Sequence, residues 1–140
     1  METFISFDLF ISHAWHNSIE YMRIVEILNE APNFYWRNYS SWEKDPIINL
    51  NSEFGKVRLT QDLEAQIKHV NLLIICADLY ATHPYWINQQ IAIAEKFNKF
   101  YVVVKPYANE PTPVVLTLNA KAVVSWETST IVDAVKKHAS

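Results

Sequence analysis

Apolar residues follow two patterns along this chain: short continuous runs, and stretches in which they recur every three or four positions. The continuous runs are rich in Phe, Ile, Val and Leu and predict strands over residues 4–12, 34–37, 72–77, 100–105 and 122–126. The helical spacing predicts helices over residues 18–29, 59–70, 84–98 and 128–138, with a further short helix over 114–118. Two of these helices have candidate N-cap residues: Asn17 or Ser18 can cap the first helix, and Thr60 can cap the second.

The order of these segments predicts the fold class. Strands and helices alternate, and the run 72–77 is apolar throughout, as in a central parallel strand covered on both faces. We therefore expect one α/β domain over residues 1–140, with a mostly parallel five-stranded sheet and helices on both faces. A flavodoxin-like strand order, 2-1-3-4-5, places the ligand crevice beyond the carboxyl ends of the first and third strands.

Three loops are expected to meet at that crevice. The first runs from Ser12 to His16, the second is the long polar and aromatic stretch 38–56, and the third is the stretch 78–83, which leads to Trp86. Such residues suit a flat ring with hydroxyl and phosphate groups rather than a bare metal ion. Each also has a purely structural interpretation: histidines at a loop surface, tryptophans as packing residues, and Asp45 before Pro46 as a turn.

Composition narrows the possible chemistry. Glycine occurs once, at Gly55, which excludes the glycine-rich dinucleotide loop, the P-loop and the GxSxG nucleophile elbow. The net charge is -3 without a basic stripe, so we expect no nucleic-acid partner. A single cysteine, Cys76, allows no intrachain disulfide and no zinc site. The first residues do not show the basic region and long apolar stretch of a signal peptide, and no apolar segment reaches 18 residues. We therefore expect a soluble, cytoplasmic protein without a membrane partner.

Two segments carry a family resemblance. The sequence FDLFISHAW, residues 7–15, resembles the opening strand and loop of Toll/interleukin-1 receptor (TIR) domains. Residues 63–91 resemble the TIR stretch of helix, central strand, polar loop, and Trp followed four positions later by Glu. The HAW and NYS…DPI stretches are most similar to the TIR-like proteins of bacterial antiphage systems of the Thoeris type.

The resemblance implies a function and a set of site residues. Enzymatic TIR domains cleave NAD between nicotinamide and ribose, and the Thoeris-like members make an ADP-ribose-derived signal that switches on a separate effector protein. NAD would then be the substrate, with no other cofactor and no metal. Gln90 occupies the position of the catalytic Glu. The same resemblance implies three groups of substrate contacts. His13, Ala14 and Trp15 lie on the loop that borders the nucleotide pocket, and Asn38, Tyr39 and Asp45 lie on the loop that gates the pocket and mediates assembly. Tyr80 and Trp86 would contact the ribose or the base.

The replacement of Glu by Gln at position 90 bears directly on catalysis. Loss of nicotinamide builds positive charge on the ribose, which a carboxylate stabilises. Glutamine keeps the shape and an acceptor oxygen but loses the charge, and losing one such group commonly costs about 10²–10³ in rate, whereas binding can survive. Gln90 is either a deliberate change that traps a ligand, a natural loss, or an alignment slip with Glu95 acting instead. The near-isosteric side chain favours the first, and Glu95 lies about 140° further round the helix.

Two other function classes remain open. One is a non-catalytic TIR module that self-associates as a homo-oligomer through the loop after the second strand, with Tyr39 and Trp42 exposed. The other is a receiver-like or flavin-binding domain, although only Asp8 is available near the first strand, where a receiver needs an acidic cluster. The enzyme hypothesis requires the side chain at position 90 to project into the crevice at the carboxyl edge of the sheet.

Overall fold

The protein is a five-stranded parallel sheet with helices on both faces, as the sequence predicts. The computed structural model describes residues 5–15, 18–40 and 52–139. Its strands are β1 (Ser6–Ile11), β2 (Tyr35–Asn38), β3 (Leu72–Cys76), β4 (Tyr101–Val104) and β5 (Val123–Val124). All neighbouring strands pair in parallel, in the order β2-β1-β3-β4-β5. The predicted flavodoxin-like strand order is therefore confirmed.

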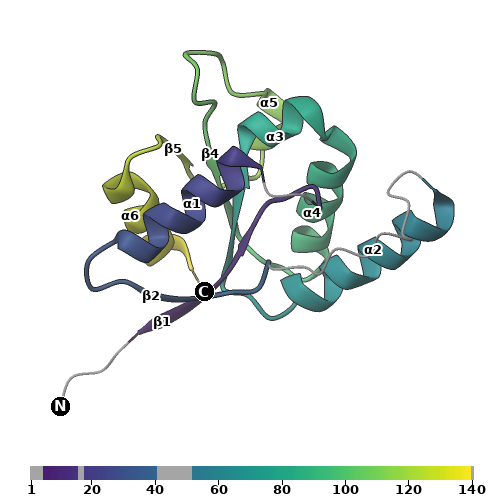
Figure 1. Ribbon diagram of the computed structural model, residues 1–140, viewed down its shortest axis with the longest axis horizontal. Helices are drawn as coiled ribbons and strands as arrows, with labels where there is room; N and C mark the ends of the chain where they lie inside the picture. The colour runs from purple at the N-terminus through teal and green to yellow at the C-terminus, as the bar shows by residue number, and fades with distance from the viewer. Residues whose placement is uncertain (1–4, 16–17, 41–51, 140) are drawn as a thin grey trace.

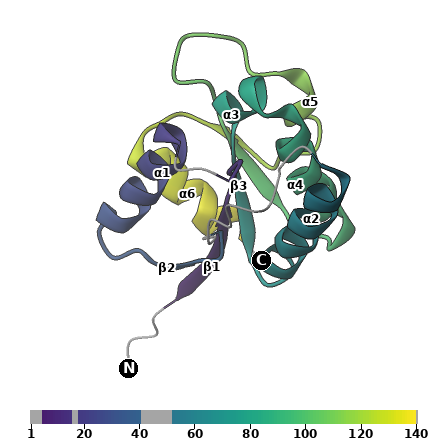
Figure 2. The ribbon, with the colours of Figure 1, turned by 45° about the vertical axis from the view of Figure 1, so that its right-hand side comes forward.

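Six helices connect these strands within the described residues. They are α1 (Ile19–Glu30), α2 (Glu53–Ile67), α3 (Ala77–Thr82), α4 (Pro84–Lys96), α5 (Val114–Thr117) and α6 (Thr128–His138). Helices α1 and α6 cover one face of the sheet, and α2 and α4 cover the other (Figures 1 and 2). Among the described residues, no helix is both long enough and apolar enough to cross a membrane.

The two central strands explain why their sequences are apolar throughout. Every residue of β3 and every residue of β4 is buried, because helices cover both faces of the sheet at these strands. Ile24 and Leu28 of α1 and Leu63 and Ile67 of α2 are also fully buried in the core. The two residues of each pair lie four positions apart, so each pair presents one face of its helix to the core.

Two helices differ from the sequence-based expectation: α2 begins earlier, and α3 replaces an expected loop. Helix α2 begins at Glu53 rather than at residue 59, because the Ser52 hydroxyl accepts a hydrogen bond from the Gly55 backbone N–H, 3.0 Å away, and caps the helix. Thr60 is therefore not the cap. Helix α3 occupies residues that were expected to form a loop, since β3 ends at Cys76 and α3 begins at the next residue.

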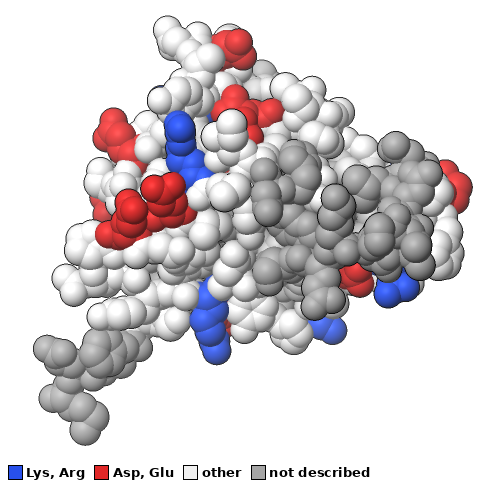
Figure 3. All heavy atoms as spheres, in the orientation of Figure 1, with Lys and Arg blue, Asp and Glu red and all other residues white. Residues whose placement is uncertain are grey.

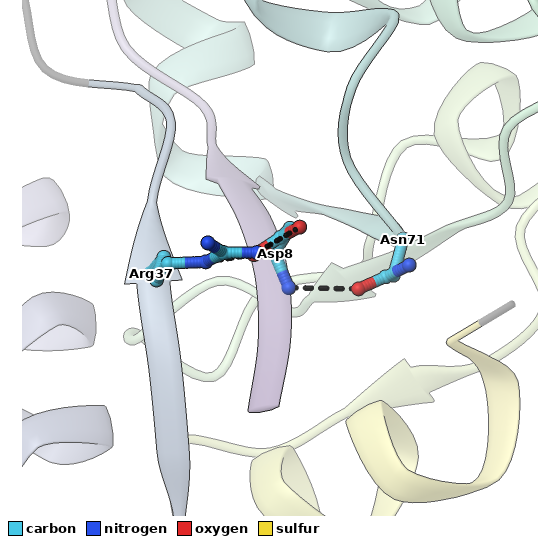
Figure 4. A network of polar contacts seen from close by, with 3 residues as sticks. All are labelled: Asp8, Arg37 and Asn71. Carbon is cyan, nitrogen blue, oxygen red and sulfur yellow. Dashed lines mark hydrogen bonds and ion pairs between the residues drawn. The ribbon is translucent and has the colours of Figure 1, made fainter. Parts of the chain in front are cut away.

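A polar contact across three strands accounts for Asp8, the one charged residue in β1. Asp8 is the register partner of Arg37 in β2, and its two carboxylate oxygens accept hydrogen bonds from the guanidinium at 2.6 and 2.9 Å. The Asp8 backbone N–H donates to Oδ1 of Asn71, 2.8 Å away, at the start of β3 (Figure 4). The carboxylate raises the pKa of the Arg37 guanidinium through this hydrogen bond and its charge. Asp8 thus has a structural role.

Candidate functional site

Gln90 lies against the loop that follows β1. Helix α4 places Gln90 and Trp86 four residues apart on its buried face, where they are 0% and 5% exposed. The Gln90 Nε2 group donates a hydrogen bond to the backbone carbonyl oxygen of His13, 2.6 Å away. The side-chain oxygen, Oε1, is buried and has no hydrogen-bond partner among the described residues. The amide therefore lies at the tip of β1, covered rather than facing an open crevice.

The loop after β1 is tied to the end of β3. The Ser12 backbone N–H donates to the Ile74 carbonyl oxygen at 2.9 Å, and the Ser12 hydroxyl accepts from the Cys76 backbone N–H at 2.8 Å. Ser12, His13 and Ala14 are all buried. These bonds fix the start of the loop at the carboxyl ends of β1 and β3, where the strand order places a ligand site.

Aromatic rings extend from this loop to the start of α4. The His13 and Trp15 rings meet edge to face at 4.8 Å, Trp15 meets Trp86 at 5.6 Å, and Trp86 meets Tyr85 at 5.0 Å. The Lys56 ammonium of α2 lies 4.7 Å from the Tyr85 ring centre. We call His13, Trp15, Trp86 and Tyr85 the aromatic row. His13 and Trp86 of this row are buried and Trp15 is half-buried. The indole Nε1 of Trp15 is buried without a hydrogen-bond partner among the described residues.

Asn38 connects to the aromatic row through Tyr21, which is not among the site residues expected from the sequence. The Tyr21 ring lies 6.2 Å from the His13 ring, and the Asn38 Nδ2 group donates to the Tyr21 hydroxyl at 2.9 Å. That hydroxyl also shares a hydrogen bond with the buried Ser40 hydroxyl at 3.3 Å. Tyr21 lies three positions before Ile24, which is buried on the inner face of α1. Helical spacing alone therefore predicts that the Tyr21 side chain points toward the core.

Two other selected residues lie elsewhere in the structure. Asn38 pairs with Leu9, so β2 ends two residues before β1 does, and the Tyr39 ring lies 6.4 Å from His69 rather than at the aromatic row. Tyr39 is half-buried, so the expectation that it is exposed is wrong. Tyr80 is half-buried on α3 and packs against the hydrophobic core. Asp45, His16 and Trp42 lie outside the described residues.

The titratable groups of the described residues do not add a nucleophile or a metal centre. Burial raises the pKa of the Cys76 thiol to about 12, which keeps it protonated and unreactive at neutral pH. No cluster of three His, Cys, Asp or Glu side chains suited to a metal ion occurs in the described part of the chain. Glu95 is exposed and accepts a hydrogen bond from Asn119 at 3.3 Å, so it does not share the buried position of Gln90.

Charge on the surface is dispersed. On the face drawn in Figure 3, the visible Lys and Arg side chains lie apart from one another, while acidic side chains gather over the region of α1. A nucleic-acid-binding face normally presents its cations as a continuous patch or stripe. The described part of this face therefore offers no such patch.

Comparison with known proteins agrees with the fold and with the family resemblance. The fold matches the crystal structure of a conserved protein from Enterococcus faecalis V583, with a TM-score of 0.58 at 11% sequence identity, over 95% of this chain and 99% of that one. No curated protein sequence matches significantly. Residues 4–111 match the family model described as the TIR-like domain of Thoeris protein ThsB. Because this match covers most of the chain, the protein belongs to the family of ThsB TIR-like domains.

Proposed function

We propose that this protein acts in antiphage defence and binds NAD at the site formed by Gln90 and the aromatic row. Catalytic TIR domains cleave NAD and, in Thoeris-like systems, release an ADP-ribose-derived signal that a separate effector protein detects. The observation that carries the proposal is the buried Gln90 amide beside Trp86, at the carboxyl ends of β1 and β3. With glutamine in place of glutamate, we expect NAD to bind but to be cleaved slowly.

The chemistry of the site supports this division between binding and cleavage. The Gln90 Oε1 atom has no partner among the described residues and could accept a hydrogen bond from a ribose hydroxyl once the buried amide is uncovered. The half-buried Trp15 indole could then contact a flat ring. Neither group carries the negative charge that stabilises the cationic ribose as nicotinamide leaves. Removing that charge weakens transition-state binding more than ground-state binding. The reaction needs no metal ion.

Tryptophan side chains provide a direct test of binding. The indole N–H signals of the protein, labelled with ¹⁵N-tryptophan, can be followed by NMR while NAD is added. We expect the signals of Trp15 and Trp86 to shift in a saturable manner, because both indoles belong to the aromatic row. Single Trp-to-Phe variants assign each signal.

Two other tryptophans serve as internal controls. The Trp36 indole donates to Oδ1 of Asn29 at 2.9 Å, and the Trp126 indole donates to the Lys105 carbonyl oxygen at 2.9 Å. Neither residue belongs to the aromatic row, so their signals should stay in place. If NAD moves no indole signal, or moves Trp36 and Trp126 but not Trp15 and Trp86, the proposed site is wrong.

A non-catalytic interaction module is the second candidate function. Helix α5 and the residue that follows it expose three apolar side chains: Val114 is 70%, Val115 46% and Leu118 71% exposed. Such a surface is suited to contact with another protein or a second copy of this chain. Sedimentation at increasing protein concentration distinguishes the two functions: assembly that Leu118→Asp abolishes, without any NAD response, favours the module.

A further inference from the structure

The hydrogen bond at Gln90 requires a donor at that position. The acceptor is the His13 carbonyl oxygen, and the donor is the side-chain Nε2 group, 2.6 Å away. A carboxylate has no proton to donate, so an ionised glutamate would place its negative charge against the carbonyl oxygen. The conformation of this loop therefore fits an amide at position 90.

The bonded loop is also in a conformation that its sequence does not favour. Three non-glycine residues of the described chain have positive φ: Trp15 at 65°, Asn33 at 55° and Asn98 at 56°. Asparagine tolerates this region, whereas a bulky side chain there is an outlier that surrounding contacts must maintain. Trp15 is held by its ring contacts with His13 and Trp86, and its backbone N–H donates to the His13 Nδ1 atom at 3.3 Å.

The loop after β1 and the Gln90 side chain thus cover each other in this conformation. Gln90 and His13 are both fully buried, so a ligand cannot touch the Gln90 Oε1 atom while the two residues stay bonded in this way. Buried acceptors without a partner are uncommon, and this one shares its amide group with the donor to His13. Opening would release both the amide and the strained Trp15 backbone.

We propose that Gln90 is a positioning residue that holds the loop Ser12–Trp15 closed, and that a nucleotide reaches the site only when the Gln90 amide leaves the His13 carbonyl. The identity of the nucleotide rests on the proposed function, whereas the closed loop does not. Only the open fraction of molecules binds, so this bond sets the apparent affinity of the site.

Side-chain amide exchange measures the bond directly. In protein labelled with ¹⁵N-glutamine, we expect the Gln90 side-chain NH₂ to exchange with solvent at least about tenfold more slowly than that of Gln89, its half-exposed neighbour on α4. Equal exchange rates at Gln89 and Gln90 overturn the inference. This measurement uses the unmodified protein, so it does not depend on the folding of any variant.

Matched variants then test what the bond holds in place. Gln90→Glu removes the donor, and we expect the Trp15 backbone amide to exchange about tenfold faster in this variant, whereas Gln89→Glu leaves it unchanged. Both variants make the same chemical change on the same helix. An unchanged Trp15 exchange rate in a folded Gln90→Glu variant contradicts the inference.

Addition of NAD separates this inference from the proposed function. We expect NAD to shift the Gln90 amide signals and speed their exchange, together with the shifts at Trp15 and Trp86. Shifts at the two tryptophans with an unchanged Gln90 amide overturn the inference and leave NAD binding intact. A protected Gln90 amide and a loop that loosens in Gln90→Glu, without any response to NAD, support the closed loop and contradict the proposed ligand.

Discussion

Asn98 occupies a backbone position with positive φ, just after α4, where glycine is the usual residue. Helix α4 ends in a Schellman motif: the Lys99 N–H donates to the Ala94 carbonyl oxygen at 2.8 Å, and the Asn98 N–H donates to the Glu95 carbonyl oxygen at 3.1 Å. The residue after the helix cap in this motif has positive φ, and here it is Asn98. With one glycine in the whole chain, asparagine serves at this position.

Substitutions at Asn98 should separate backbone strain from side-chain contacts. We expect Asn98→Gly to change the free energy of unfolding by less than about 0.5 kcal/mol, because both residues accept positive φ. Asn98→Val should destabilise the protein by about 1–2 kcal/mol, since a β-branched residue is strained there. Denaturant titration measures both. Equal stability of the two variants would contradict the Schellman assignment.

At the scale of helices and strands, long apolar runs and long helical repeats predict the elements well. Short segments with few apolar residues do not reveal their secondary structure. The buried strands β3 and β4 follow directly from unbroken apolar runs. The apolar pattern does not reveal residues 53–58 of α2 or any part of α3. Gly55 is a poor helix former, so Ser52 was not recognised as a cap. Helix α3 is a six-residue segment that follows β3 without a connecting loop, and it is too short for helical spacing to reveal.

Capping provides a test at this scale. The Ser18 hydroxyl accepts a hydrogen bond from the Tyr21 backbone N–H at 3.1 Å, so Ser18, one of the two candidates from the sequence, caps α1. Ser18→Ala should lower the free energy of unfolding by about 1 kcal/mol, because this N–H loses its side-chain acceptor. Ser18→Asp keeps an acceptor and should retain most of the stability. Thermal unfolding compares the two, and a Ser18→Ala variant as stable as wild type would contradict the cap.

For the molecule as a whole, the sequence predicts the strand order of the sheet, but not how the loop after β1 is arranged against α4. The loop after β1 and Trp86 meet because parallel strands end at the same edge. The hydrogen bond from Gln90 to His13 joins residues 77 positions apart, and the positive φ of Trp15 depends on tertiary contacts. Neither has a local sequence signal. Tyr39 lies away from the row because of strand register, which the sequence does not specify.

Alkaline pH should destabilise the whole molecule through two buried groups. Burial raises the pKa of the Cys76 thiol to about 12 and also raises the pKa of Tyr101. Because the folded protein favours the protonated forms, their contribution to stability is complete below the ordinary pKa of Cys76 of 9.0 and is lost as pH rises from there toward 12.

Urea unfolding over this range measures the effect. The free energy of unfolding should fall with rising pH above 9, the ordinary pKa of Cys76. Cys76→Ala should weaken this dependence without abolishing it, since Tyr101 still titrates. A pH dependence of the Cys76→Ala variant that equals that of wild type would show that the thiol makes no contribution.

Release of nicotinamide from NAD tests the central claim most directly. Wild type, Gln90→Glu and the matched control Gln89→Glu would be compared after their folding is verified, alone and with lysate from phage-infected cells. A carboxylate at position 90 should raise the rate about 10²–10³-fold over wild type, because it restores charge beside the developing cation, whereas Gln89→Glu should behave as wild type. If Gln90→Glu releases nicotinamide no faster than Gln89→Glu under either condition, position 90 does not belong to an NAD-cleaving site.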